Sequence, residues 1–128
     1  MKTLKFFSSL KDDRGLLKSI EILNFNLFKI KRIFIINFKK KKLRGNHAHK
    51  KCKQFIICTN GKIRVKCTKN NNKKEFILTP NIDGLYIKAK TWVILEPLQK
   101  NTEIICLCDM KYLKSDYITD YKKLNTYK

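Results

Sequence analysis

Residues 44–61 read RGNHAHKKCKQFIICTNG, and this stretch contains both histidines of the 128-residue chain. If the chain around them is extended, side chains two positions apart project to the same face of the strand. His47 and His49 then point together, and Ala48 points to the opposite side. The apolar run FIIC at 55–58 is followed by an Asn-Gly pair, which is typical of a turn between strands. The stretch therefore predicts β structure with two imidazoles on one face.

The spacing that follows the histidines indicates a more specific fold. Four residues separate His49 from Gln54, and six residues separate Gln54 from Gly61. This spacing resembles the first cupin motif, in which HxH is followed at these intervals by a glutamate and a glycine. The glutamate position of that motif is a glutamine here.

This substitution leaves too few donors for a metal cupin. Such a site uses two histidines, the glutamate and a further histidine, whereas this chain has two histidines and the neutral Gln54. A divalent cation usually takes three or more protein donors. We therefore expect no metal and no cofactor. Two imidazoles with an ordinary pKa of about 6.5 are suited to moving protons near neutral pH. Two half-exposed strand histidines without a role are the alternative.

Short segments rich in Ile, Val, Phe, Tyr and Thr recur at intervals of about ten residues. None before residue 109 shows a sustained helical period. The pattern predicts an all-β, single-domain cupin or jelly-roll β-barrel over residues 1–128. The polar, tyrosine-rich tail predicts a short C-terminal helix that starts near Ser115. The expected strands are 16–23, 30–38, 53–58, 62–68, 74–78, 84–88, 91–95 and 103–108.

Asparagine and glycine mark the turns between these strands. The pair Asn60-Gly61 lies between two of them and predicts a type I′ hairpin. The cluster at 70–72, three consecutive asparagines, is expected to join the next pair of strands. Residues 80–84 are expected to form a further loop.

The net charge of +20 favours an anionic partner, because basic faces supply most non-specific affinity for phosphates. Only four of the 30 basic residues are arginine, the residue favoured for bidentate contacts with phosphates and bases. The lysines are spread along the chain, and the run Lys39–Lys42 is expected to be a solvated loop. A nucleic-acid-binding domain is therefore a weaker hypothesis than a protein whose charge attracts an anionic small molecule.

The five cysteines form no CxxC pair, which favours reduced, mostly buried thiols in a cytosolic protein. None is assigned a catalytic role. The longest apolar runs, such as residues 33–36 and 55–58, are far shorter than the roughly 20 residues of a membrane helix. Asp12 and Asp13 directly follow the apolar N-terminal patch, so we predict no signal peptide.

Further motifs fall in the order found in one family of cupins. RGNHAHK with Gln54 is the most specific of them. The others are Asp13-Arg14-Gly15, Ile30-Lys31-Arg32, Gly84-Leu85-Tyr86 followed by Trp92, and Asp109-x-x-Tyr112 followed by Asp116-Tyr117-Ile118-x-Asp120-Tyr121. With these motifs most of the chain resembles the dTDP-4-keto-6-deoxyhexose 3,4-ketoisomerases, also called WxcM-like sugar-nucleotide isomerases.

The resemblance implies a metal-free homodimer that acts in the cytoplasm on a dTDP-linked 4-keto-6-deoxy sugar, with no nucleic-acid or membrane partner. The 3-keto product would enter deoxyamino-sugar biosynthesis for surface polysaccharides such as lipopolysaccharide. In this reaction a proton leaves C3, an enediol forms, and a proton returns at C4. Such chemistry needs a base beside the carbon and a donor for the developing enolate oxygen.

By resemblance, His49 is the base at carbon and His47 relays or donates protons at the sugar oxygens, although the two roles could be reversed. Gln54 could hold a hydroxyl or carbonyl group without attracting a metal. Arg14 and Arg44 are expected to bind the diphosphate or orient the sugar, because forked guanidinium groups suit phosphate oxygens. Surface or structural ion pairs are the alternative for both arginines.

Two aromatic residues, Tyr86 and Trp92, are candidates to flank the sugar or thymine, although strand aromatics are more often core residues. The chain also departs from the family. Members commonly carry a tyrosine in the strand before RGxHAHK, and this chain has Phe34-Ile35 there. The residue after Trp92, usually polar in the family, is Val93. These departures favour the alternative of a non-catalytic cupin-like module that binds a nucleotide sugar or a partner protein.

Overall fold

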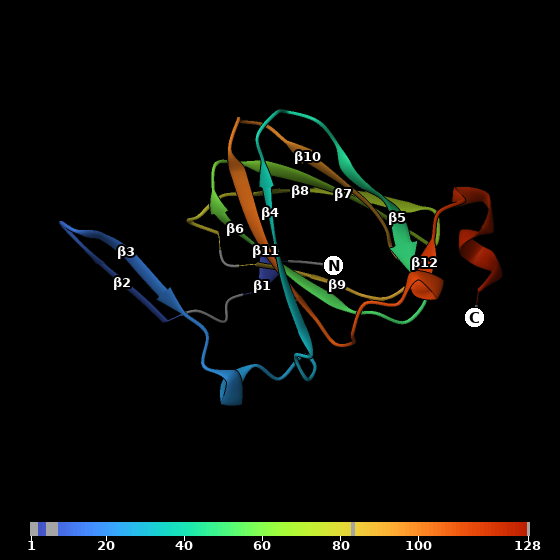
Figure 1. Ribbon diagram of the computed structural model, residues 1–128, viewed down its shortest axis with the longest axis horizontal. Helices are drawn as coiled ribbons and strands as arrows, with labels where there is room; N and C mark the ends of the chain where they lie inside the picture. The colour runs from blue at the N-terminus through green and yellow to red at the C-terminus, as the bar shows by residue number, and fades with distance from the viewer. Residues whose placement is uncertain (1–2, 5–7, 83, 128) are drawn as a thin grey trace.

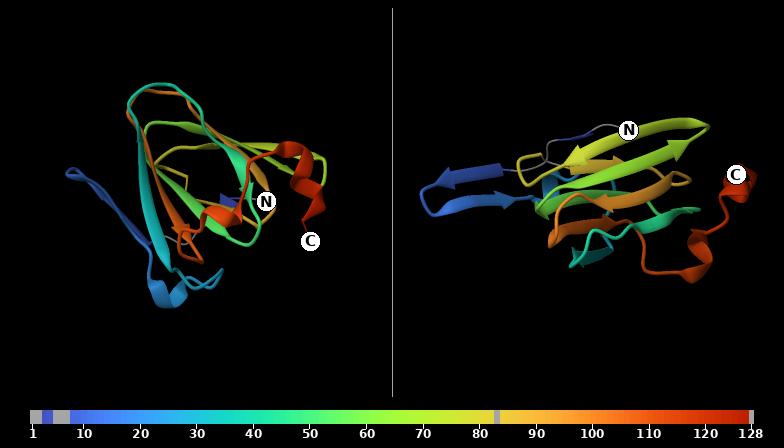
Figure 2. Two further views of the ribbon diagram at one scale, coloured as in Figure 1. Left: turned by 45° about the vertical axis from the view of Figure 1, so that its right-hand side comes forward. Right: turned by 90° about the horizontal axis from the view of Figure 1, so that it is seen from above.

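Two five-stranded sheets face each other and enclose the core in the computed structural model of this chain (Figures 1 and 2). The structure describes residues 3–4, 8–82 and 84–127. Neighbouring strands in both sheets are antiparallel. The prediction of an all-β jelly-roll fold is confirmed. In the described part of the chain, no helix is long and apolar enough to cross a membrane.

The strands of the first sheet, in spatial order, are β1 (Thr3–Leu4), β9 (Gly84–Ile87), β6 (Gln54–Asn60), β11 (Thr102–Cys108) and β4 (Arg32–Phe38). Those of the second are β12 (Tyr117–Ile118), β5 (Arg44–His49), β10 (Trp92–Pro97), β7 (Ile63–Lys69) and β8 (Asn72–Leu78). A separate hairpin of β2 (Ser8–Asp12) and β3 (Gly15–Ser19) projects away from the two sheets (Figure 1).

The core lies between the sheets, and strands such as β7 direct alternate side chains into it. In β7, for example, Ile63, Val65 and Cys67 are fully buried, whereas the residues between them are half-buried. Burial of an Ile or Val side chain stabilises the fold by about 1.5–3 kcal/mol. The run 55–58 in β6 is buried on both faces, because Phe55 packs outside the first sheet against Phe25 with ring centroids 5.5 Å apart.

The turn chemistry differs from the prediction at one asparagine pair. Strands β6 and β7 flank Asn60-Gly61 but belong to different sheets, so the predicted type I′ hairpin there is wrong. Gly61 has a φ of 77°, but Asn60 does not have the positive φ that a type I′ turn requires. A two-residue hairpin turn is instead formed by Asn70 and Asn71, which have φ of 51° and 65°. This turn joins the paired strands β7 and β8.

Two other expected elements differ by more than one or two residues at an end. The expected strand 16–23 is instead β3, which ends at Ser19, followed by the 3-10 turn η1 (Ile22–Asn24). The predicted C-terminal helix is present as two 3-10 turns, η2 (Lys114–Asp116) and η3 (Tyr121–Thr126). Between these turns β12 pairs with β5, placing Tyr117 opposite His49.

Candidate active site

A cavity of about 260 Å³ lies between the two sheets. Strands β4, β5, β6, β10, β11 and β12 all contribute to its lining. Most of this lining is apolar. The polar side chains that reach it are Arg32, Arg44, His47, His49, Gln54 and Tyr117.

A β-bulge at Gly45 and Asn46 sets which way the two histidines point. Both bulge residues have positive φ, 81° and 61°, and the register of β5 against β10 shifts between Val93 and Ile94. A Cβ on Gly45 would lie 2.9 Å from the Val93 carbonyl oxygen, so the position requires glycine. After the bulge, strand alternation directs His47 and His49 into the cavity.

His49 is held in one orientation by a carboxylate. Its Nδ1 lies 2.9 Å from Asp116 Oδ2, and both side chains are buried. Asp116 is itself held in place, because its Oδ1 accepts a hydrogen bond from the Lys51 backbone N–H at 2.8 Å. The carboxylate can only accept, so Nδ1 donates and the lone pair of a neutral imidazole is on Nε2. His49 Nε2 is buried without a hydrogen-bond partner. Its lone pair is therefore available to accept a proton from a substrate.

His47 lies beside His49 with ring centroids 5.3 Å apart. Its Nδ1 is also buried without a partner. Burial, and to a lesser degree repulsion from His49, lowers the pKa of His47 below its ordinary value. His47 is therefore neutral near pH 7 and can accept a proton.

Tyr117 completes an aromatic cluster with the two imidazoles. Its ring centroid lies 4.9 Å from that of His47 and 4.4 Å from that of His49. Burial raises the pKa of Tyr117, although the positively charged Arg32 partly opposes this rise. The phenol is therefore protonated at neutral pH.

Gln54 and one thiol, that of Cys106, also line the cavity. Gln54 is buried, and its Nε2 lies 3.9 Å from Cys108 Sγ. The Cys106 thiol, whose Sγ lies 3.9 Å from Cys108 Sγ, holds the pKa of Cys108 below its ordinary value, whereas burial raises the pKa of Cys106. All five cysteines are free and buried, which confirms the predicted buried thiols.

The structure brings four of the seven predicted site residues to this cavity: His47, His49, Gln54 and Arg44. The other three lie elsewhere in the chain. Arg14 is in the turn of the β2–β3 hairpin, where it pairs with Asp12 at 2.6 Å.

The two predicted aromatic residues lie outside the cavity, in packed positions. Tyr86 packs against Phe28, with ring centroids 6.2 Å apart, in the apolar cluster that contains Phe55. Trp92 donates from Nε1 to Asn46 Oδ1 at 3.1 Å and is buried against Ile118.

Sequence reasoning assigned no role to Arg32, Asp116 or Tyr117. Asp116 and Tyr117 are in the C-terminal tail, whose polar, tyrosine-rich composition predicted a short helix starting near Ser115. The signal that could have found them is their place in the closing motif Asp116-Tyr117-Ile118-x-Asp120-Tyr121, which carried part of the family resemblance. Only the pairing of β12 with β5 places the two residues beside His49.

An antiparallel jelly roll with paired imidazoles in the cavity between its sheets defines the cupin class. The family model described as FdtA, WxcM-like, C-terminal matches residues 1–128, and the chain belongs to this family.

Similar proteins carry related names. A TDP-4-oxo-6-deoxy-alpha-D-glucose-3,4-oxoisomerase from Aneurinibacillus thermoaerophilus is 34% identical over 94% of this chain and 88% of its own. A 3,4-ketoisomerase from Helicobacter canadensis is 33% identical, with a TM-score of 0.83 over 92% of this chain and 90% of its own. A mutant of the 3,4-ketoisomerase QdtA from Thermoanaerobacterium thermosaccharolyticum, in complex with TDP-4-keto-6-deoxyglucose, is 28% identical. Its TM-score is 0.86 over 94% of this chain and 89% of its own.

Proposed function

We propose that this protein is a metal-free isomerase that converts a dTDP-4-keto-6-deoxyhexose to its 3-keto isomer. One observation supports the chemistry most strongly: His49 Nε2 is buried without a partner in the cavity, while Asp116 holds Nδ1. A relative named as a 3,4-oxoisomerase of TDP-4-oxo-6-deoxyglucose supports the substrate class. Residues 1–128 would act as one domain in this isomerase.

The reaction moves hydrogen within the sugar and needs no co-reactant. His49 Nε2 takes the proton from C3, and the electron pair moves toward the C4 carbonyl oxygen. Protonation of that oxygen gives an enediol. Loss of the proton from the C3 oxygen and return of a proton to C4 then give the 3-keto sugar. A positioned base typically contributes about 10²–10⁴-fold to such a step.

The other polar groups of the cavity suit binding. Arg44 lies in the lining beside the bulge, so its guanidinium is a candidate to bind the diphosphate. Gln54 can donate to or accept from a sugar oxygen without attracting a cation. The net charge of +20 raises the local concentration of an anionic substrate.

Deuterium exchange tests the function directly. The protein is incubated with dTDP-4-keto-6-deoxyglucose in deuterated buffer, and incorporation at C3 and C4 is followed by NMR. We expect incorporation together with the 3-keto product. Tight dTDP binding without exchange would instead support the non-catalytic module. Salt-dependent DNA binding without dTDP affinity would support the nucleic-acid hypothesis.

Chelators are expected to leave the rate unchanged. His49, Cys52 and Asp116 offer donor atoms within 4.8 Å of one another, but the His49–Asp116 hydrogen bond already uses two of them. After dialysis against EDTA, the exchange rate should stay within about twofold of the untreated value, because proton transfer by imidazole needs no Lewis acid. A loss of activity that added Zn²⁺ or Mn²⁺ restores would contradict a metal-free mechanism.

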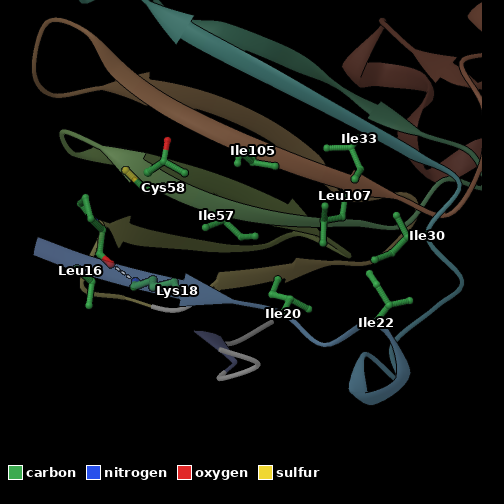
Figure 3. Close-up of a pocket in the computed structure, with 12 residues that line it drawn as sticks. Leu16, Lys18, Ile20, Ile22, Ile30, Ile33, Ile57, Cys58, Ile105 and Leu107 are labelled. Carbon is green, nitrogen blue, oxygen red and sulfur yellow. Dashed lines mark hydrogen bonds between the residues drawn. The ribbon is translucent and has the colours of Figure 1, made fainter. Parts of the chain in front are cut away.

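The proposed active form is a homodimer in the cytoplasm. An apolar groove of about 520 Å³ lies between the β3 end of the hairpin and the outer face of the first sheet (Figure 3). Leu10 and Leu17 of the hairpin are 57% and 60% exposed. The chain thus carries an exposed apolar projection and an apolar groove beside it, and a second copy could cover both reciprocally about a two-fold axis. The groove residues include Leu16, Ile20, Ile22, Ile30, Ile33, Ile57, Ile105 and Leu107.

In such a dimer Arg14 could act only across the subunit boundary, because it lies at the tip of the projecting hairpin (Figure 2). The free thiols of the chain suit a reducing compartment, which supports the cytoplasmic proposal.

Substitution on the hairpin tests the dimer. Leu17→Glu is expected to shift sedimentation velocity from dimer to monomer at micromolar concentration, because it places a charge in the proposed apolar interface. Ile77→Glu is the matched control, since Ile77 is 39% exposed on β8 of the other sheet, and it should remain dimeric. A monomeric wild-type protein, or a Leu17→Glu dimer of unchanged affinity, would contradict this interface.

A further inference from the structure

Tyr117 is the only residue with a hydroxyl group among the described residues that line the cavity. The other lining side chains are the two imidazoles, two guanidinium groups, one amide, one thiol and apolar groups. Strand β4 supplies no hydroxyl, because Phe34 lines the cavity and Ile35 is 62% exposed on the opposite face. A phenol therefore enters this cavity from β12 and not from β4.

The position of Tyr117 places it within reach of both proposed proton carriers. It is the cross-strand partner of His49, so the two side chains share one face of the sheet. Its ring also contacts His47 edge-on, with an angle of 85° between the ring planes. A sugar oxygen that lies near both imidazoles would thus lie near Tyr117 as well.

Arg32 provides the phenol with a charged neighbour. Its guanidinium acts to lower the pKa of the Tyr117 phenol, and the guanidinium carbon lies 4.8 Å from the Phe34 ring centroid and 5.2 Å from that of Tyr112. Within the described part of the chain, Arg32 forms no salt bridge with a carboxylate. Its positive charge can therefore stabilise negative charge that builds up on the phenol or on a bound sugar oxygen.

We propose that Tyr117 is a third catalytic group, which moves a proton between the two sugar oxygens; this role rests on the proposed isomerase function. As His49 takes the C3 proton, the Tyr117 hydroxyl gives its proton to the C4 oxygen, and the enediol forms. The transient phenolate, beside Arg32, then takes the proton from the C3 oxygen while a proton returns from His49 to C4. The phenol and the imidazole both return to their starting states, so the cycle consumes no other reactant.

Tyr117→Phe tests this role because it removes the hydroxyl and keeps the ring. We expect kcat for isomerisation to fall by about 10²-fold or more, with dTDP affinity and Tm close to the wild-type values. The control is Tyr112→Phe, since Tyr112 is 56% exposed and contacts the same ring cluster, and it should keep kcat within about twofold.

A second variant separates catalysis from packing. Site-specific incorporation of a fluorinated tyrosine at position 117 keeps the hydroxyl but lowers its pKa. The alkaline limb of the kcat–pH profile should then move to lower pH, which a purely structural role would not cause. If wild-type protein exchanges deuterium but Tyr117→Phe keeps kcat within threefold, or the alkaline limb does not move, Tyr117 is not catalytic. If wild-type protein forms no 3-keto product, the isomerase function itself fails.

Discussion

In the His49→Asn variant, deuterium exchange at C3 of dTDP-4-keto-6-deoxyglucose should fall by about 10²–10⁴-fold, whereas dTDP affinity stays within a few fold. In the wild-type structure, His49 Nδ1 lies 2.9 Å from Asp116 Oδ2. An asparagine side chain reaches about as far as Nδ1, so its amide can still donate to Asp116. It has no group at the position of Nε2. The substitution therefore removes the proposed carbon base while keeping the buried hydrogen bond.

The matched control is His47→Asn, because His47 lies on the same strand and face but is not held by a carboxylate. If His47 acts at the sugar oxygens, this variant should lose net isomerisation but keep more exchange at C3 than His49→Asn. The reverse pattern would show that His47 is the carbon base and that His49 acts at the sugar oxygens. Unchanged exchange in His49→Asn, measured by NMR alongside circular dichroism, would remove His49 from the mechanism.

Asp116→Asn is expected to lower kcat by about 10²–10⁴-fold by selecting the wrong tautomer of His49. When the new amide donates its N–H to His49 Nδ1, Nδ1 becomes an acceptor. The imidazole proton then moves to Nε2, which can no longer accept the C3 proton. A comparable substitution in the serine-protease triad costs about 10⁴-fold. Some stability is also expected to be lost, because Asp116 Oδ1 accepts from the Lys51 backbone N–H at 2.8 Å.

Histidine ¹⁵N NMR distinguishes these two effects. In the wild-type protein the lone pair of neutral His49 should be on Nε2, and in Asp116→Asn it should be on Nδ1. Asp109→Asn is the control, because Asp109 also accepts a backbone hydrogen bond, from Lys53 at 2.8 Å, but touches no histidine in the described structure. Full activity in Asp116→Asn, or an unchanged tautomer, would show that Asp116 does not position His49.

Much of the β structure could be predicted because strand patterning is local. The alternation of buried and half-buried residues in β7, and the run 55–58 in β6, follow from side chains that leave a strand on alternating faces. The same rule placed His47 and His49 in one cavity. Gln54 was also identified from the sequence. Its distance along the chain from the two histidines corresponds to the short connection between β5 and β6.

Pairing between strands could not be predicted in the same way. The Asn60-Gly61 pair has the composition of a hairpin turn, yet its flanking strands belong to different sheets, because β6 pairs with β9 and β11. The outward positions of Tyr86 and Trp92 also depend on which face of each strand meets the opposing sheet. An aromatic residue on a strand suits either a cavity or a packed outer face.

The amino-acid sequence by itself determined most of the strands and the shared direction of the two imidazoles, since both depend on backbone geometry within a few residues. Only the tertiary structure decided that Asp116 and Tyr117, more than 60 positions from His49, meet it through the β12–β5 pair. Contacts of such long range arise from sheet pairing and burial, which no local pattern in a polar tail encodes.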